Sequence, residues 1–139
     1  MDKAEIRRKL LVLNWPKEDY WVVAGGAMVL YGLRAETRDL DLGCTAAWAD
    51  ALEASGVPFR YMDDGSGRWF TLDTDVEVFE NWLIDRTEIV EDIPVISLKG
   101  LIEMKRALGR EKDIRDIALI KKAMEADPSL KQSDNPSLK

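Results

Sequence analysis

The sequence contains no histidine and a single cysteine, Cys44, among 139 residues. One cysteine cannot form an intrachain disulfide, and without histidine it cannot complete a Cys/His zinc site. Any metal site must therefore use oxygen ligands, which suit Mg²⁺, Mn²⁺ or Ca²⁺. Catalytic triads and acid–base mechanisms that depend on histidine are excluded as well.

Excess basic charge and long apolar runs are also missing. The 20 basic residues are outnumbered by 26 acidic residues, which gives a net charge of −6. This balance argues against bulk binding to a nucleic-acid backbone, although a local basic groove stays open. No run approaches the roughly 20 apolar residues of a membrane span. The N-terminal segment lacks the apolar core and cleavage site of a signal peptide. We therefore expect a cytoplasmic protein that does not enter a membrane.

The rest of the composition is that of one folded domain, with 46% hydrophobic residues. We expect the domain to span residues 1–126 and a mobile polar tail to span 127–139. Apolar periodicity and turn residues predict helices and strands at these positions: helices 2–13, 27–33, 46–55, 98–108 and about 112–126; strands 20–24, 40–44, 59–62, 68–72, 75–79 and 93–96. This order predicts an α/β (α+β) fold, a sheet with helices mainly on one face and the other face open for a site. In the last helix, the residues expected to face inward are Ile114, Ile117, Ala118 and Met124.

The pair Gly25-Gly26 follows a buried strand and directly precedes a helix. Such a turn exposes the first amide groups of the helix, which attract phosphate, and glycine allows a close approach. The alternative is a tight turn that needs a positive φ. For a glycine pair taken alone, this alternative is favoured.

Asp39 and Asp41 alternate with Leu40 and Leu42, so on a strand the two acids share one face. At about 4 Å and an effective dielectric constant near 20, two carboxylates repel by about 4 kcal/mol. The fold tolerates this if one acid is protonated, if both are solvated, or if a cation lies between them. A solvated pair at a strand end is the alternative to a metal site.

A third acid is expected from the strand at 75–79, where Asp75 and Glu77 alternate with apolar residues. If this strand is the neighbour of strand 40–44, Glu77 or Asp75 joins the two aspartates. Three carboxylates on one sheet face with two divalent ions form a phosphoryl- or nucleotidyl-transfer site. The alternative for Glu77 is a solvated acid on an edge strand.

Basic residues near the expected site are Lys105, Arg110 and Lys112, which could contact a triphosphate or an acceptor. The alternative is a solvated helix face on which they pair with neighbouring acids. Arg38 is expected to pair with Glu36 or with an acid on a helix.

Five tryptophans are many for this length. Trp21, Trp48 and Trp82 fit packing in the core or at an interface. Trp69 lies on a strand near the expected site, where it could stack on a nucleobase or pack in the core.

Together these segments resemble the nucleotidyltransferase superfamily of the polymerase-β type, and more closely its minimal and AbiEii-like prokaryotic members. The resemblance covers about residues 20–120. It is carried by these segments: Gly25-Gly26-Ala27, Thr37-Arg-Asp39-Leu-Asp41-Leu, Val76-Glu77-Val78, Ile96 to Lys105, and Gly109 to Asp116. The family usually has Gly-Ser at the loop and Asp as its third acid. Gly26 therefore lacks a hydroxyl contact to phosphate, and Glu77 has an arm one methylene longer.

The resemblance implies a two-metal mechanism. Asp39 and Asp41 would hold two Mg²⁺ ions, or Mn²⁺ in their place, and Glu77 would hold the one beside the acceptor. The acceptor hydroxyl would attack the α-phosphate of a nucleoside triphosphate in line and release pyrophosphate. The implied nucleotide contacts are those of Gly25, Gly26, Thr37, Lys105 and Lys112.

The acceptor stays open between a protein, a tRNA and a small molecule, and the acidic surface slightly disfavours tRNA. Small members of the family often form half of a toxin–antitoxin pair, so a partner protein or a second copy of the chain is expected to help hold the acceptor. Two other hypotheses remain. One is a catalytically inactive relative that binds a nucleotide or a protein, and the other is a structural domain whose acids only keep it soluble.

Overall fold

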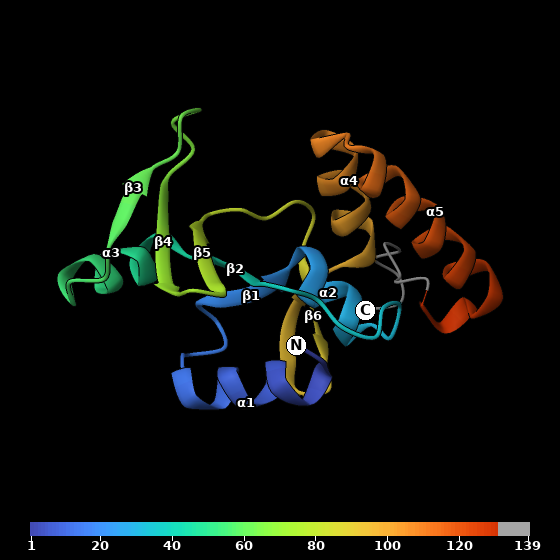
Figure 1. Cartoon of the computed structure of the whole chain (residues 1–139), viewed down its shortest axis with the longest axis horizontal. Coiled ribbons are helices and arrows are strands. Elements are labelled where there is room, and N and C mark those ends of the chain that lie inside the picture. Colours follow the sequence, from blue (N-terminus) through green and yellow to red (C-terminus); the bar gives the residue numbers. More distant parts are fainter. Residues whose placement is uncertain (131–139) are drawn as a thin grey trace, which may run out of the picture.

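The computed structural model describes residues 1–130, and residues 131–139 lie outside it. In the described part, seven strands form one mixed sheet in the order β3-β4-β5-β2-β1-β7-β6 (Figure 1). The strands are β1 Tyr20–Val23, β2 Leu40–Cys44, β3 Phe59–Tyr61, β4 Arg68–Asp73, β5 Val76–Glu80, β6 Thr87–Val90 and β7 Ile93–Ile96. The pairs β1–β7 and β2–β5 are parallel, whereas the other neighbours are antiparallel. The predicted α/β fold is confirmed.

The helices of the described part are α1 Lys3–Leu13, α2 Ala24–Leu30, α3 Ala46–Ala54, α4 Leu98–Leu108 and α5 Glu111–Ala126, with a 3₁₀ turn at Pro128–Leu130. In Figure 1, α1 lies below the sheet and the α4–α5 hairpin lies above and to the right of it. The side chains of Asp2, Thr45 and Ser97 each accept a hydrogen bond from an amide in the first turn of α1, α3 and α4. No helix within residues 1–130 has the length and apolar content needed to cross a bilayer.

One strand, β6, is missing from the sequence prediction. It pairs with β7 through a two-residue turn in which Glu91 and Asp92 have φ values of 49° and 72°. Hairpin turns with positive φ usually carry glycine or asparagine. Because Glu91 and Asp92 occupy these positions, the sequence contained no turn residues that would have predicted the hairpin. The predicted mobile tail lies largely in residues 131–139, outside the described residues.

The prediction for the inner face of α5 is wrong for Ile114, which is 62% exposed, and for Ala118, which is also exposed. The residues that α5 buries are Asp113, Asp116 and Ile120. Apolar periodicity failed because α5 packs against α4 partly through ion pairs, which compensate two buried carboxylates.

The two faces of β2 and β5 have different environments. Leu40, Leu42 and Val78 are fully buried, and Val76 nearly so, in the core that α1 covers. Because side chains alternate along a strand, Asp41 points to the opposite face of the sheet. The core thus determines which residues reach the open face.

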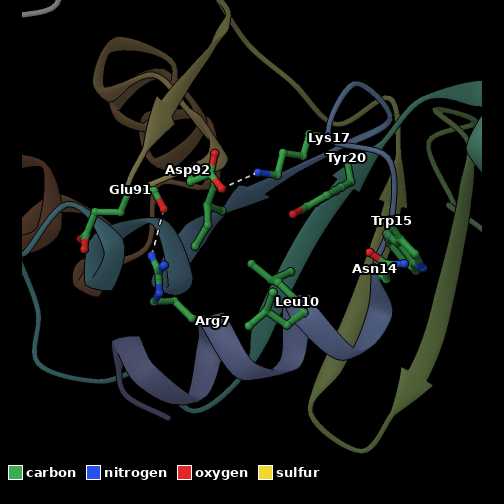
Figure 2. Close-up of a pocket in the computed structure, with 10 residues that line it drawn as sticks. Arg7, Leu10, Asn14, Trp15, Lys17, Tyr20, Glu91 and Asp92 are labelled. Carbon is green, nitrogen blue, oxygen red and sulfur yellow. Dashed lines mark hydrogen bonds and ion pairs between the residues drawn. The ribbon is translucent and has the colours of Figure 1, made fainter.

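Ion pairs join α1 and the segment after it to the β6–β7 turn. Arg7 donates to the carbonyl oxygen of Glu91 at 2.9 Å, and Lys17 lies 2.7 Å from Asp92 (Figure 2). A small pocket of about 110 Å³ lies beside them, with Leu10 on its wall. Exposed ion pairs of this kind add little stability, so apolar residues such as Leu10 hold α1 in place.

A more enclosed ion cluster joins β4, β5 and α3. Arg68 contacts both oxygens of Glu80 at 2.8 and 2.9 Å, and it reaches Glu53 and Asp50 at 2.9 Å each. The side chains of Arg68 and Glu80 are only 11% exposed. Arg68 lowers the pKa of Glu80 by hydrogen bonding to its charged form. Removal of either partner would leave a charge in a poorly solvated place.

We predict that Arg68→Met lowers the free energy of unfolding by about 3 kcal/mol, because Glu80 then lacks its partner. Arg115→Met is the matched control, since Arg115 and its partner Glu111 are 68% and 90% exposed. The control should change stability by less than about 0.5 kcal/mol. Urea unfolding measures both variants, and equal losses would contradict the role assigned to Arg68.

Candidate functional site

Asp41 and Glu77 are direct neighbours across the parallel strands β2 and β5. Asp39 is exposed and directly precedes β2, so it lies near the starts of β2 and β5, close in sequence to Asp41. Asp75 is placed elsewhere, because its carboxylate pairs with Lys9 of α1 at 3.3 Å. Of the two candidates for the third acid, the structure brings Glu77 to the aspartates.

The electrostatics show that these acids act on one another. Burial and, to a smaller extent, the negative charges of Glu77 and Asp39 together raise the pKa of Asp41 to about 6, against the opposing charges of Lys112 and Arg110. The charged form of Asp41 is therefore costly in the protein alone. A cation placed beside Asp41 would relieve this cost.

Carboxylate oxygens are the ligands that Mg²⁺ and Mn²⁺ prefer, so the donor chemistry of the site fits such an ion. Within residues 1–130, however, no three acidic side chains stand close enough together to ligate one ion. Oε2 of Glu77 accepts a hydrogen bond from Trp69 Nε1 at 3.0 Å, so this carboxylate already has a partner in the protein alone.

A pocket of about 460 Å³ opens beside the two aspartates. Its walls come from the start of α2, the segment 34–41, and the α4–α5 hairpin. Five basic side chains line it: Arg34, Arg38, Lys105, Arg110 and Lys112. Four acidic side chains line it as well: Glu36, Asp39, Asp41 and Asp116. The pocket lining therefore has more basic than acidic side chains, although the protein as a whole has a net charge of −6.

The basic residues of the pocket differ in their exposure and in whether they have an ion-pair partner. Arg38 and Lys112 are exposed, and neither side chain has a hydrogen-bond or ion-pair partner within residues 1–130. The expected pair between Arg38 and Glu36 is thus not formed, although both residues line the pocket. Lys105 is only 5% exposed and donates to Asp116 at 3.0 Å. It thus has an acidic partner, as the alternative proposed, but it is buried and does not lie on a solvated helix face.

Arg34 is a pocket residue that the sequence pattern did not reveal. It pairs with Asp116, so this one carboxylate holds both Arg34 and Lys105 at the pocket wall. Arg110 is anchored in the same way, by two hydrogen bonds to Asp113 at 2.6 and 3.1 Å. Neither motif nor periodicity marks Arg34, because only the fold brings segment 31–38 to α5.

The two glycines have separate environments. Gly25 lines the pocket, and a Cβ there would lie 2.2 Å from Thr37 Oγ1, so glycine lets Thr37 pack against the start of α2. Gly26 faces the core, where a Cβ would lie 2.9 Å from Val22. The positive φ that one alternative assigned to the pair belongs instead to Ala24, at 55°.

Trp69 is enclosed by its neighbours. Its ring stacks on Phe79 at 5.6 Å, and the guanidinium of Arg60 lies 3.9 Å from the ring centre. Trp69 is thus half-buried and packs on these neighbours outside the hydrophobic core, so the core position of the second alternative is not observed. Beyond Phe79 lies a further pocket of about 380 Å³ with apolar walls, to which Trp82 and Leu108 contribute.

No family model matches the sequence, and no curated protein matches it either. Two solved structures are similar. One is a presumed nucleotidyltransferase from Thermotoga maritima, with 20% identity over 91% of this chain and 96% of that one, and a TM-score of 0.59. The other is ANT(2″)-Ia in complex with adenylyl-2″-tobramycin, with 16% identity over 91% of each chain and a TM-score of 0.55. At these identities the likeness shows the fold, which is that of nucleotidyltransferases; the AbiEii-like subfamily stays a prediction.

The raised pKa of Asp41 has a consequence for stability. Its folded value of about 6 exceeds the ordinary value of 3.8, so the folded protein loses stability as the pH rises from about 4 to about 6. Asparagine cannot ionise and escapes this cost. We predict that Asp41→Asn is more stable than the natural sequence above pH 6, by about 2 kcal/mol, and that this advantage shrinks near pH 4.

Urea unfolding of both proteins near pH 4.5 and near pH 7.5 measures the difference. An advantage that is independent of pH, or a variant less stable than the natural sequence at the higher pH, would contradict the assigned cause.

Proposed function

We propose that the protein is a nucleotidyltransferase that moves a nucleoside monophosphate from a nucleoside triphosphate to an acceptor hydroxyl. The observation that carries the proposal is the pairing of Asp41 with Glu77 beside a pocket with two cations, Arg38 and Lys112, that have no partner in the described part of the chain. Acids on one side and cations on the other match the two needs of this reaction, which are metal binding and triphosphate binding. The nucleotidyltransferase fold supports the same proposal.

Asp39, Asp41 and Glu77 would hold two divalent ions, Mg²⁺ or Mn²⁺. When bound, such ions supply positive charge at the phosphate oxygens and lower the pKa of the acceptor hydroxyl. Asp41 suits a ligand because its pKa of about 6 leaves it mostly ionised near pH 7, at a cost that a cation removes.

The triphosphate would lie against the basic wall. Arg38 and Lys112 are free to pair with phosphate oxygens, whereas Lys105 is held by Asp116 and adds its charge from within the wall. Thr37, packed on Gly25, forms the end of the pocket nearest α2. Gly26 would support this wall from the core rather than contact phosphate directly.

The acceptor would approach from the side of Glu77, where Phe79, Trp82 and Leu108 line the apolar pocket. Asp64 and Glu80 lie at the same pocket and disfavour an acceptor rich in phosphate. A protein or a small molecule is favoured over tRNA for this reason. Incubation with labelled triphosphates, Mg²⁺ and a host lysate would show which molecule gains the label, and a labelled partner protein would support a toxin–antitoxin role.

Binding without transfer is the second candidate function. It is favoured by the finding that no group of three acidic side chains within residues 1–130 could hold a metal ion. An inactive protein would gain thermal stability from Mg²⁺ with a triphosphate but would release no pyrophosphate.

We predict that Asp39→Asn and Asp41→Asn each reduce pyrophosphate release by about 10³-fold or more, because each removes a charged ligand, and that Glu77→Gln slows it less. Asp75→Asn is the matched control, since Asp75 pairs with α1. It should retain nearly full activity. Unchanged turnover in either aspartate variant, or loss of turnover in the control, would refute the site.

For the basic wall, we predict that Lys112→Met raises the KM for the triphosphate about tenfold with little change in kcat, because it removes a phosphate contact from the ground state and the transition state alike. Lys122→Met on the same helix is the control, since Lys122 is exposed outside the pocket. Steady-state kinetics distinguish the two, and equal KM values would place the triphosphate elsewhere.

A further inference from the structure

The guanidinium group of Arg34 reaches two parts of the pocket beside the aspartates. Arg34 belongs to the segment between α2 and β2, and its side chain is 35% exposed. One terminal nitrogen, Nη2, donates to Oδ1 of Asp116 on α5. The other, Nη1, lies at the start of α2, 3.6 Å from the position that a Cβ of Gly25 would occupy. Arg34 therefore extends from α5 to the corner that Gly25 and Thr37 form.

Asp116 is the carboxylate that fixes this orientation. It is only 8% exposed, and its second oxygen, Oδ2, accepts a hydrogen bond from Lys105 Nζ at 3.0 Å. Although burial alone would raise it, the hydrogen bonds from Lys105 and Arg34 hold the pKa of Asp116 below its ordinary value. The carboxylate therefore stays ionised at neutral pH, and one negative charge holds two cations from different elements.

The contact with Asp116 leaves hydrogen-bond donors of Arg34 available. Neither Nε nor Nη1 of Arg34 has a hydrogen-bond partner within residues 1–130. Because Gly25 has no side chain, nothing at this position covers Nη1. The planar fork of a guanidinium matches the oxygens of a phosphate group, and hydrogen bonds between the two are charge-assisted. An anion at this corner of the pocket could thus bind Arg34 without displacing Asp116.

The charges of this group also favour an anion. Arg34, Lys105 and Asp116 together carry two positive charges and one negative charge, so one positive charge remains in the pocket wall. Glu36 is an acid of the same pocket with a different setting, because it is exposed and has no ion-pair or hydrogen-bond partner in the described part of the chain. Of these two acids, only Asp116 orients cations.

We propose that Arg34 binds a phosphate group of the nucleoside triphosphate at the corner formed by Gly25 and Thr37, and that Asp116 is the positioning residue that aims Arg34 and Lys105 at this group. These contacts are hydrogen bonds between the protein and phosphate oxygens, and they need no metal ion. The inference rests on the proposed function for the identity of the ligand as a nucleoside triphosphate.

Binding of inorganic tripolyphosphate in a buffer free of divalent cations tests the proposal apart from metal binding and turnover. Isothermal titration calorimetry gives the dissociation constant. We expect Asp116→Asn to weaken binding about tenfold, because Arg34 and Lys105 are no longer held in place. Removal of a negative charge would by itself strengthen the binding of an anion. The direction of the change therefore separates positioning from simple electrostatics.

Glu36→Gln is the matched control, since it removes the same charge from the same pocket without freeing a cation. It should bind tripolyphosphate as tightly as the natural sequence or more tightly. Equal weakening by Glu36→Gln and Asp116→Asn would overturn the role of Asp116.

Arg34→Lys tests the geometry at constant charge. A single ammonium group cannot contact Asp116 and the corner at Gly25 at once, so we expect binding about tenfold weaker. Arg115→Lys is the control, because Arg115 is 68% exposed on α5 outside the pocket, and it should keep full affinity. Since Arg34 is not buried, this variant decides the proposal even if Asp116→Asn does not fold.

A combination of the two variants separates positioning from a purely structural role of Asp116. In an Arg34→Lys background, Asp116→Asn should weaken binding less than it does in the natural sequence, because one of the two cations that it aims is already misplaced. Equal losses in both backgrounds would assign Asp116 to the fold alone and would overturn its role as a positioning residue.

Three further results would overturn the proposal: no binding of tripolyphosphate by the natural sequence, binding by Asp116→Asn that is unchanged or tighter, or full affinity in Arg34→Lys. These outcomes are distinct from those that test the transfer reaction. Pyrophosphate release with unchanged affinity in both variants would reject only the roles of Arg34 and Asp116. Weakened binding in both variants, without any pyrophosphate release by the natural sequence, would reject only the transfer activity.

Discussion

The parallel pairing of β2 with β5 is the constraint on which the rest of the site depends. It is enforced from the core side, where Leu40 and Leu42 of one strand pack beside Val76 and Val78 of the other. A slip of one residue would turn these apolar side chains to solvent and bury the acids, which would cost far more than it relieves. The core therefore compels Asp41 and Glu77 to be neighbours. The raised pKa of Asp41 is the electrostatic consequence of that packing.

The fold tolerates this confinement of negative charge by bringing cations to it from distant parts of the chain. The α4–α5 hairpin carries Lys105, Arg110 and Lys112 to the pocket, and two buried acids of α5 hold it together. Asp116 anchors Lys105 and Arg34 at once, and Asp113 anchors Arg110. Arg38 and Lys112 keep their charges unpaired within residues 1–130. The pocket thus contains both acidic and basic side chains. A triphosphate with bound metal ions would find acids for the metal ions and basic residues for the phosphates.

The sequence predicted the parts of this arrangement that follow from local pattern. Strict alternation of apolar and acidic residues placed Asp41 and Glu77 on strands, and apolar periodicity placed the helices. Features that depend on long-range packing were not readable. The buried face of α5 contains two aspartates, so apolar periodicity predicted the wrong inner face for this helix. Strand β6 was not predicted because the turn that follows it contains no glycine. Arg34 and the Trp69–Glu77 bond arise from segments that meet only in the folded chain, while Gly26 proved to be a packing residue.

The most direct test of the account is a crystal structure of the protein with Mn²⁺ and a non-hydrolysable nucleoside triphosphate analogue. We predict anomalous scattering from Mn²⁺ beside Asp39, Asp41 and Glu77, with the triphosphate against Arg38 and Lys112. Mn²⁺ bound away from these acids, or a nucleotide seated outside this pocket, would contradict it.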